Sequence, residues 1–453
     1  MNPKLAVAGG SDPTGAIDPL HSWWMPFTHN RRFRSKPHLI ESAAGAYYTL
    51  TDKGRVFDCL SGMWCTPLGH SHPGIVRAVT DQVQRLDYSP GFQLGHKSAF
   101  ELATRIAQLA GRPRDRVFFV NSGSEAVDTA LKIAIGYHRV RGDAARTRVI
   151  GRERGYHGVG LGGLSVGGIG VNRKMFGSMM MPGVDHLPHT YSHKHMAFSR
   201  GLPQWGAHLA DELERLVALH DASTIAAVIV EPVQGSTGVI VPPRGYLERL
   251  REICSKHGIL LIFDEVITGF GRLGKPFASQ LFGVQPDLTT FAKAVTNGVV
   301  PMGGVLARAD IYDAFMTGPE HVIEFFHGYT YSGHPLAVAA AHASIDALVD
   351  QRLIERAAEL APVLEQAVHT LRDEPHVVDI RNIGLAAAVE LEPLTGQPGA
   401  RGYRAFERGL DEGILLRLMG DIIGLAPPFI SSAEEVGAMI DSLRRTLRAI
   451  AAD

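Results

Sequence analysis

The chain has 453 residues, of which 45% are hydrophobic and 20% charged, a globular balance with length for a large core and at least two domains. Its 45 Lys and Arg residues oppose 46 Asp and Glu residues, and the net charge of -1 argues against nucleic acid or an anionic membrane as a partner. The 3 cysteines do not suggest a disulfide framework, and neither a signal peptide nor an apolar run of about 18 to 20 residues is visible, so we predict a cytoplasmic protein.

Residues 1 to about 20 lack any periodicity, which predicts a loose tail. Further along, short apolar runs without alternation are typical of parallel strands buried on both faces, and they occur at Val117–Val120, Ile225–Val230 and Ile259–Phe263. Stretches with helical spacing lie among them, such as Ser98–Leu109 and Tyr246–His257. This alternation predicts an α/β fold with a parallel sheet covered on both sides.

The pattern of the sequence changes after Tyr331. Two long helical stretches, Pro335–Val349 and Leu353–Leu371, lead to the segment Val377–Glu392 and a closing α/β segment. The pattern indicates a smaller C-terminal α/β domain that a long helix joins to the first.

A small polar turn, Asn121–Glu125, follows the strand Val117–Val120 and runs directly into a helix. Free N–H groups and the positive end of the helix dipole then face whatever lies above Ser122, Gly123 and Ser124, which favours a phosphate. An ordinary helix cap would use the same residue types.

Two further residues stand at predicted strand ends, where ligands bind in open parallel sheets. Asp264 ends the strand Ile259–Phe263 and is either a helix cap, a structural ion pair or a partner for a cationic ring nitrogen. Lys293 lies in apolar company. Burial would lower its pKa and leave an amine able to form a Schiff base, whereas a lysine that reaches solvent would stay protonated.

A phosphate site, a carboxylate and a lysine in this order are what a pyridoxal phosphate (PLP) site requires. The chain also resembles the class III aminotransferases of PLP fold type I over nearly its whole length. The motifs that carry the resemblance are Asn121–Glu125, Gly155–Gly158, Glu231–Gly235, Asp264–Arg272, Ala292–Lys293 and Gly328–Pro335. Within the class the chain is most similar to the ω-amino acid–pyruvate (β-alanine–pyruvate) aminotransferases. The segments behind this finer similarity are Ser89–Gln93, Asp185–His189 and Val295–Gly298.

The resemblance implies an N-terminal tail and segment packing on the small domain over residues 1–64, a large PLP-binding domain over 65–330 and a small domain over 331–453. It implies a homodimer with its active sites at the interface, and it leaves a tetramer open. Amino transfer from an ω-amino acid such as β-alanine, or from a primary amine, to pyruvate would run through an aldimine on Lys293 and pyridoxamine phosphate.

Roles follow from the resemblance at matching positions. Lys293 and Asp264 would be catalytic, with Asp264 on the ring nitrogen. The remaining cofactor contacts would come from Ser122, Gly123, Ser124, Tyr156, His157, Glu231, Gln234, Val266 and Thr330. Of these, Tyr156 and Val266 would pack on the two ring faces, and Thr330 would reach the phosphate of the neighbouring subunit.

Substrate recognition draws on a separate part of the chain. Arg417 stands alone in the apolar run Leu415–Gly420, as a structural arginine or as one that binds a carboxylate bidentately. The resemblance assigns it to the carboxylate of pyruvate or alanine, and it assigns Trp64 and Phe92 to the substrate pocket. Core packing would account for either aromatic residue equally.

Three competing functions are also compatible with the sequence. A class III decarboxylase, racemase or aminomutase would keep the cofactor and break another bond, and a non-catalytic relative would keep only the fold. A nicotinamide dehydrogenase rests on the glycine pattern Gly158–Gly163 alone, which does not directly follow a strand. The histidines between His186 and His195 lack metal-ligand spacing, so we predict no metal site.

Overall fold

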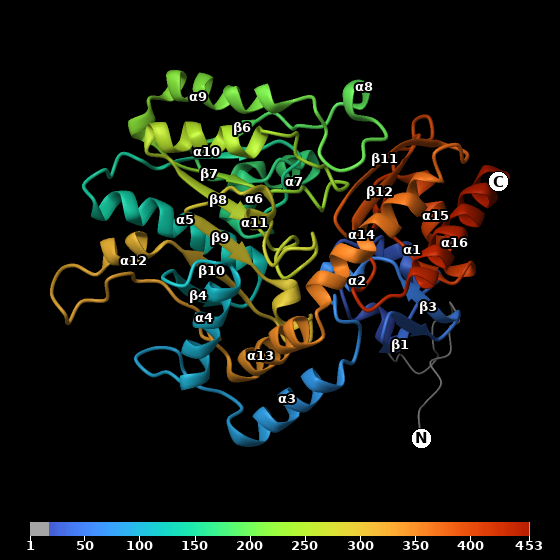
Figure 1. The fold of residues 1–453 in the computed structure, drawn as a ribbon, viewed down its shortest axis with the longest axis horizontal. Helices are drawn as coiled ribbons and strands as arrows, with labels where there is room; N and C mark the ends of the chain where they lie inside the picture. The colour runs from blue at the N-terminus through green and yellow to red at the C-terminus, as the bar shows by residue number, and fades with distance from the viewer. Residues whose placement is uncertain (1–17, 453) are drawn as a thin grey trace.

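The computed structural model describes residues 18–452, so most of the predicted N-terminal tail lies outside the described residues. Its centre is a seven-stranded sheet with the order β4-β10-β9-β8-β7-β5-β6 (Figure 1). All strands run parallel except β10, which is antiparallel to both of its neighbours. In sheet order the strands are β4 (Arg116–Val120), β10 (Gly303–Ala307), β9 (Leu288–Phe291), β8 (Leu260–Asp264), β7 (Ile225–Val230), β5 (Arg148–Arg152) and β6 (Val184–Leu187).

Both faces of this sheet are buried, because successive side chains of its central strands enter two different cores. Ala227 and Ile229 of β7 pack with α5 (Gly123–Val140), whereas Val228 and Val230 pack with α9 (Glu212–His220) and α10 (Tyr246–His257). Figure 1 shows α9 and α10 together above the sheet. The continuous apolar runs in the sequence are therefore explained, and the predicted α/β class with a mostly parallel sheet is confirmed.

Further helices surround the sheet, and the predicted helices are present within a few residues of their expected bounds. In chain order these are α3 (Pro73–Arg85), α4 (Lys97–Leu109), α6 (Leu161–Val166), α7 (Gly170–Phe176), α8 (His193–Met196), α11 (Ala278–Phe282), α12 (Ala309–Phe315) and α13 (Pro335–Asp350). Helix α13 packs on α3, α4 and the 3-10 turn Lys293–Thr296.

Two smaller sheets lie beside this body (Figure 1). One has the order β11-β12-β15-β14 and is antiparallel throughout; the other has the order β1-β2-β3-β13. Their strands are β1 (Ile40–Ala44), β2 (Tyr47–Leu50), β3 (Gly54–Asp58), β11 (Val377–Ile383), β12 (Ala386–Leu391), β13 (Ile414–Leu415), β14 (Arg417–Met419) and β15 (Ile422–Leu425). The accompanying helices are α1 (Asn30–Ser35), α2 (Ser61–Trp64), α14 (Leu353–His369), α15 (Ala400–Asp411) and α16 (Ala433–Ala452).

The two ends of the chain meet in the second of these sheets. Strand β3 pairs in parallel with β13, so that Phe57 lies opposite Ile414 and Asp58 opposite Leu415. An N-terminal segment is thereby built into the C-terminal part of the fold. The predicted domain boundaries at residues 65 and 331 stay a prediction.

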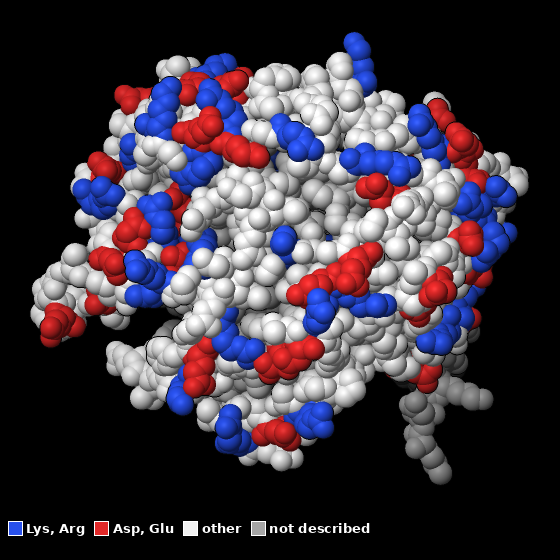
Figure 2. Space-filling view, viewed as in Figure 1, with Lys and Arg blue, Asp and Glu red and all other residues white. Residues whose placement is uncertain are grey.

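The surface carries both signs of charge intermixed, as Figure 2 shows for one face. No helix among residues 18–452 is long and apolar enough to cross a membrane. The geometry that matters for function lies where the central strands end.

Candidate active site

The carboxyl ends of three neighbouring strands bring an amine and two carboxyl groups together. Asp264 ends β8, Glu231 follows β7 directly, and Lys293 comes two residues after β9. Parallel strands end at one edge of a sheet, so these side chains meet there. They line a single cavity with Gly123, Ser124, Tyr156, His157, Gly158, Ser236, Val266 and Ile267.

The N-terminus of α5 forms one wall of this cavity. Ser122 is the N-cap, and its Oγ accepts a hydrogen bond from the N–H of Glu125 at 3.1 Å. Its oxygen thus accepts in the cap, as the simpler interpretation of the turn supposed, while its O–H can still donate. The N–H groups of Gly123 and Ser124 begin the helix and lack an intrahelical acceptor, which makes this end a favourable anion site.

Two glycines keep the space at this helix end open. A Cβ on Gly158 would lie 2.4 Å from Ser124 Oγ, and the φ of Gly158 is +90°. A Cβ on Gly123 would lie 3.0 Å from a methyl carbon of Val266. A side chain at Gly158 would collide with Ser124, and one at Gly123 would press on Val266, so the first residue of α5 and the glycine after His157 both keep this cradle open.

Asp264 is buried and held by three donors. Its Oδ2 pairs with Nδ1 of His157 at 2.7 Å, and its Oδ1 accepts from the Thr290 hydroxyl at 3.0 Å and from the Val266 N–H at 3.2 Å. Such contacts fix the direction of a carboxylate and stabilise its charge. The carboxylate is therefore rigidly presented to a cationic group in the cavity.

Glu231 supports the neighbouring loops from a buried position. Its carboxylate accepts from the N–H of Tyr156 at 2.9 Å and from the N–H of Gly235 at 3.2 Å. Burial raises its pKa to about 7, with Asp264 adding to the increase and His157 opposing it. Glu231 is therefore a buried carboxyl group that binds a proton more readily than a glutamate in water.

Lys293 reaches the cavity from a strained piece of backbone. Its φ of +52° is in the left-handed region, which non-glycine residues seldom adopt and which concentrates at functional sites. Removal of the amine from water lowers its pKa, and the nearby Cys65, Asp264 and Glu231 oppose that effect. A lowered pKa increases the share of neutral amine, the form that reacts with a carbonyl.

Arg417 interacts with Tyr156 but does not line the cavity of this cluster. It is the first residue of β14 and is half-buried. Its charge acts on Tyr156, as do the charges of Asp264 and Glu231. No carboxylate among residues 18–452 forms an ion pair with Arg417. A partly buried guanidinium without an acid partner is available to bind a carboxylate from outside the chain.

Six of the predicted contacts do not line this cavity. Ser122 caps α5 and Arg417 lines a separate cavity beside α15; the other four are Trp64, Phe92, Gln234 and Thr330. Gln234 is fully buried and donates to the carbonyl of Glu153 at 3.0 Å, while Trp64 is buried in an apolar cluster. Phe92 is exposed and packs near Gly328, and Thr330 is exposed as well. Their roles stay predictions, and for Trp64 and Gln234 the observed packing is of the structural kind.

Four residues of the site were missed by sequence reasoning, and the glycine after His157, Gly158, is one of them. Ser236 and Ile267 line the cavity, and Thr290 bonds Asp264. The pairing of Thr290 with Asp264 follows from the register of β8 and β9, which places the two residues opposite each other. The signal in the sequence is position: Ser236 directly follows the motif Glu231–Gly235, and Ile267 lies within the motif Asp264–Arg272.

The sequence profile of class-III aminotransferases matches residues 29–447. The chain therefore belongs to the class III aminotransferases. The dehydrogenase alternative is wrong: the glycine pattern leads into α6, where the N–H of Gly163 donates to Asp128 Oδ1 of α5 at 2.8 Å, and the site has the parts of an aminotransferase.

Comparison with individual proteins shows which aminotransferases the chain is similar to. The chain is 56% identical to the ω-aminotransferase of Caulobacter vibrioides over 96% of this chain and 98% of that protein. It is 50% identical to the β-alanine–pyruvate aminotransferase of Pseudomonas aeruginosa over 100% of both chains. Among solved structures, a PLP-bound amine transaminase from an uncultivated Pseudomonas species has a TM-score of 0.87 and 36% identity, and covers 94% of this chain and 98% of its own.

An (S)-enantioselective ω-transaminase from Thermomicrobium roseum has a TM-score of 0.89 and 34% identity, and it covers 95% of this chain and 97% of its own. The predicted resemblance to class III aminotransferases of the ω-amino acid type is thus confirmed at the level of sequence and fold.

Proposed function

We propose that this enzyme transfers an amino group from an ω-amino acid such as β-alanine, or from a primary amine, to pyruvate, with PLP as its cofactor. The observation that carries this proposal is Arg417, a half-buried guanidinium that interacts with Tyr156 of the site and has no acid partner among residues 18–452. The relatives named for β-alanine–pyruvate and ω-amino acid transfer support the same substrates.

The residues present fit the cofactor. The N-terminus of α5 and the space kept open by Gly123 and Gly158 suit a phosphate, and Asp264 suits a protonated pyridine nitrogen. Tyr156 and Val266 line the cavity and would hold the ring between them. When bound, PLP would supply a carbonyl to capture the amino group and a ring that accepts electrons from the substrate carbon.

The chain's own residues would orient the reactants and move the proton. Asp264, fixed by His157 and Thr290, holds the proton on the ring nitrogen. The Nζ of Lys293 would take the proton from the substrate carbon as a base and deliver it to the carbonyl-derived carbon of the cofactor as an acid, for which its lowered pKa is suited. Arg417 binds the carboxylate of pyruvate and turns aside for amines that lack one.

We propose further that the enzyme works in the cytoplasm as a homodimer whose sites lie at the interface. Large apolar side chains are exposed close to the predicted partner contacts, among them Phe92, Phe326 and Tyr331. Exposed apolar surface of this kind is typical of protein interfaces. Thr330 lies in the same exposed segment and would reach the phosphate of the neighbouring subunit.

A donor panel tests the proposed reaction. Purified holoenzyme is mixed with β-alanine, γ-aminobutyrate, a diamine or an aryl amine without keto acid, and the absorption spectrum of the cofactor is followed. We expect conversion to the aminated cofactor, reversed by pyruvate with formation of alanine. Product without that cycle, as a decarboxylase or racemase would give, overturns the proposal.

A further inference from the structure

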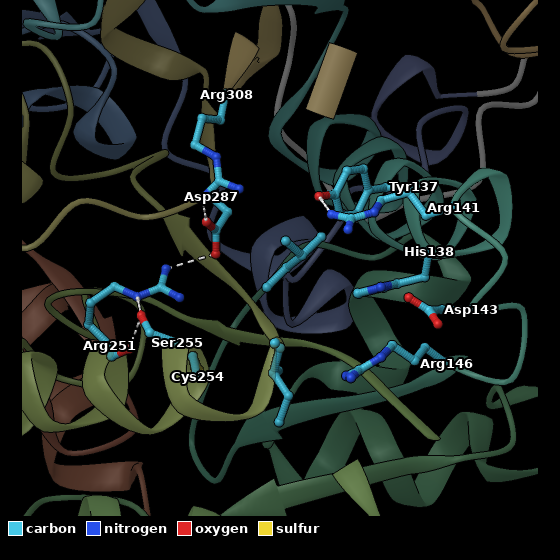
Figure 3. Close-up of a pocket in the computed structure, with 13 residues that line it drawn as sticks. Tyr137, His138, Arg141, Asp143, Arg146, Arg251, Cys254, Ser255, Asp287 and Arg308 are labelled. Carbon is cyan, nitrogen blue, oxygen red and sulfur yellow. Dashed lines mark hydrogen bonds and ion pairs between the residues drawn. The ribbon is translucent and has the colours of Figure 1, made fainter. Parts of the chain in front are cut away.

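A second cavity lies at the opposite end of the central strands from Lys293, with a volume of about 370 Å³ (Figure 3). Cavities of this size are typical of small-molecule sites. It borders Leu260, the first residue of β8, and Asp287, which precedes β9. The two cavities share strands but no lining residue.

One wall of this cavity is formed by acidic and basic side chains that pair with one another. Asp287 accepts hydrogen bonds from Arg251 at 2.7 Å, from Arg308 and from the N–H of Leu261 at 2.7 Å. Arg308 also pairs with Asp310 at 2.5 Å. These groups satisfy one another, so this wall is fixed in place and contributes little free charge.

The facing wall carries the positive charges of Arg141 and Arg146. Arg141 bonds only the hydroxyl of Tyr137, while Arg146 donates to three main-chain carbonyls, among them that of Ala222 at 2.8 Å. Neither guanidinium forms an ion pair with a carboxylate of residues 18–452. Figure 3 shows both arginines across the cavity from Asp287. Carbonyl oxygens satisfy the N–H groups of Arg146 but leave its full charge uncompensated.

Negative groups also border the cavity, but they do not cancel the positive charge of Arg141 and Arg146. The carboxyl ends of α5 and α10 border the cavity, and Asp143 adds a carboxylate without a partner in the described chain. Arg146 covers the end of α10 by donating to the carbonyl of His257 at 3.2 Å. Four arginines and two aspartates line the cavity. A third aspartate, Asp310, lies outside the lining and pairs with one of these arginines, Arg308. Positive charge remains in excess.

We propose that this cavity binds an organic phosphate, a phosphomonoester of small size. Guanidinium groups bind phosphate through forked N–H donors, and Arg141 and Arg146 supply two of them. The hydroxyl of Tyr137 accepts from Arg141, and its proton has no acceptor among residues 18–452, so it donates to the same group. Ile259 and Leu260 give an apolar floor for the organic part.

Calorimetric titration of the holoenzyme with glycerol 3-phosphate tests the site. Bound PLP fills the phosphate cradle of the active site, and low ionic strength preserves electrostatic attraction. We expect one saturable site per chain, with affinity about tenfold weaker in Arg141→Gln. Arg139→Gln is the matched control, because Arg139 is exposed on the same helix and does not line the cavity. Binding unchanged in Arg417→Ala separates the site from the substrate site.

Asp143→Asn should change the affinity for glycerol 3-phosphate in the opposite direction to Arg141→Gln. It removes a repulsive carboxylate, so the affinity should rise several-fold, and this result supports the site even where Arg141→Gln fails to fold. Absence of saturable binding, unchanged affinity in Arg141→Gln or weaker binding by Asp143→Asn overturns the proposal. Equal affinity for succinate overturns the assignment to phosphate, and equal affinity for inorganic phosphate overturns the role of the apolar floor.

Discussion

Lys293 combines a left-handed backbone, a lowered pKa and a position at the end of a buried strand. The backbone conformation and the burial of the amine each cost stability, and together they present an amine of lowered pKa at one point of the cavity. The surrounding strands hold the residue in this geometry because β9 is paired on both sides. The strain is thus confined to the residue that the proposed chemistry uses.

Replacement of the amine tests this role directly. In Lys293→Ala no group remains to move the proton at the substrate carbon, and we expect turnover of β-alanine and pyruvate to fall by at least ~10³-fold. Lys275→Ala is the control, because Lys275 is exposed in the same part of the fold. Alanine formation is the measurement, and normal turnover by Lys293→Ala would remove the lysine from the mechanism.

Arg417 separates keto-acid recognition from the rest of the reaction. In Arg417→Ala the KM for pyruvate should rise about tenfold or more, because a charged, bidentate contact is lost. Simple amines should still aminate the cofactor at the normal rate. Arg404→Ala, which changes an exposed arginine nearby in the chain, should leave both unchanged. Equal losses for carboxylate and amine substrates would contradict the assignment.

Glu231 makes stability depend on pH. Its pKa is raised from 4.5 to about 7 in the folded protein, so between these values the folded state holds a proton that the unfolded chain has lost. Stability therefore falls as the pH rises from about 4.5 to about 7, by up to ~3 kcal/mol. In Glu231→Gln this fall should disappear. Tm of the cofactor-free protein at pH 5 and pH 8 is the measurement, and an equal pH dependence in both proteins contradicts the prediction.

At the scale of elements, a buried ion network ties the small antiparallel sheet to the loop after β7. Arg381 of β11 donates to the carbonyl of Gly238 at 2.6 Å and pairs with Asp379 at 2.5 Å and Glu390 at 2.6 Å. Tyr191 donates to the same Asp379 at 2.9 Å. The sheet that carries Arg417 is thereby fixed against the loop that carries Ser236, which sets the distance between the two halves of the proposed site.

The loop at Gly158 meets the N-terminus of α5 more closely than any side chain would allow. In Gly158→Ala the new Cβ would collide with Ser124 Oγ, and we expect weaker retention of PLP and a lower Tm. Gly142→Ala is the matched control: its φ of +92° is similar, but open space surrounds its Cβ. Both variants lose about 1 kcal/mol from the backbone conformation. Only Gly158→Ala should lose PLP on dialysis; equal loss would refute the steric explanation.

At the scale of the whole molecule, parts of the proposed site lie on exposed segments. Thr330 and Phe92 are both exposed, although the resemblance assigns one to the cofactor and the other to the substrate. A second copy of the chain over these segments would bury them and complete each site. Exposed apolar side chains around them give such an interface its driving force.

Mixed dimers test whether Thr330 acts across the interface. Subunits with Lys293→Ala and subunits with Thr330→Ala are coexpressed with different tags, and the mixed species is purified. If Thr330 serves the neighbouring subunit, one site of the mixed dimer has both residues, and about half of the wild-type activity per dimer should return. Activity no higher than that of the Thr330→Ala homodimer would show that the residue acts within its own chain.

Much of the fold could be read from continuous segments. The apolar runs predicted strands β4, β7 and β8, and the helical spacing predicted α4, α10, α13 and α14, because a period of two or 3.6 residues is a property of neighbouring residues. The motif order also predicted which residues follow those strands. Ser124, Asp264 and Lys293 duly line one cavity.

Contacts between distant segments were decided by the tertiary structure. The register of β8 against β9 places Thr290 on Asp264, and packing buries Trp64 and directs Gln234 to Glu153. The sequence by itself determined the class of fold, the family and the residues at the strand ends, since these depend on local pattern. Only the folded chain determined which side chains share a partner, because register and packing join residues that no local pattern relates.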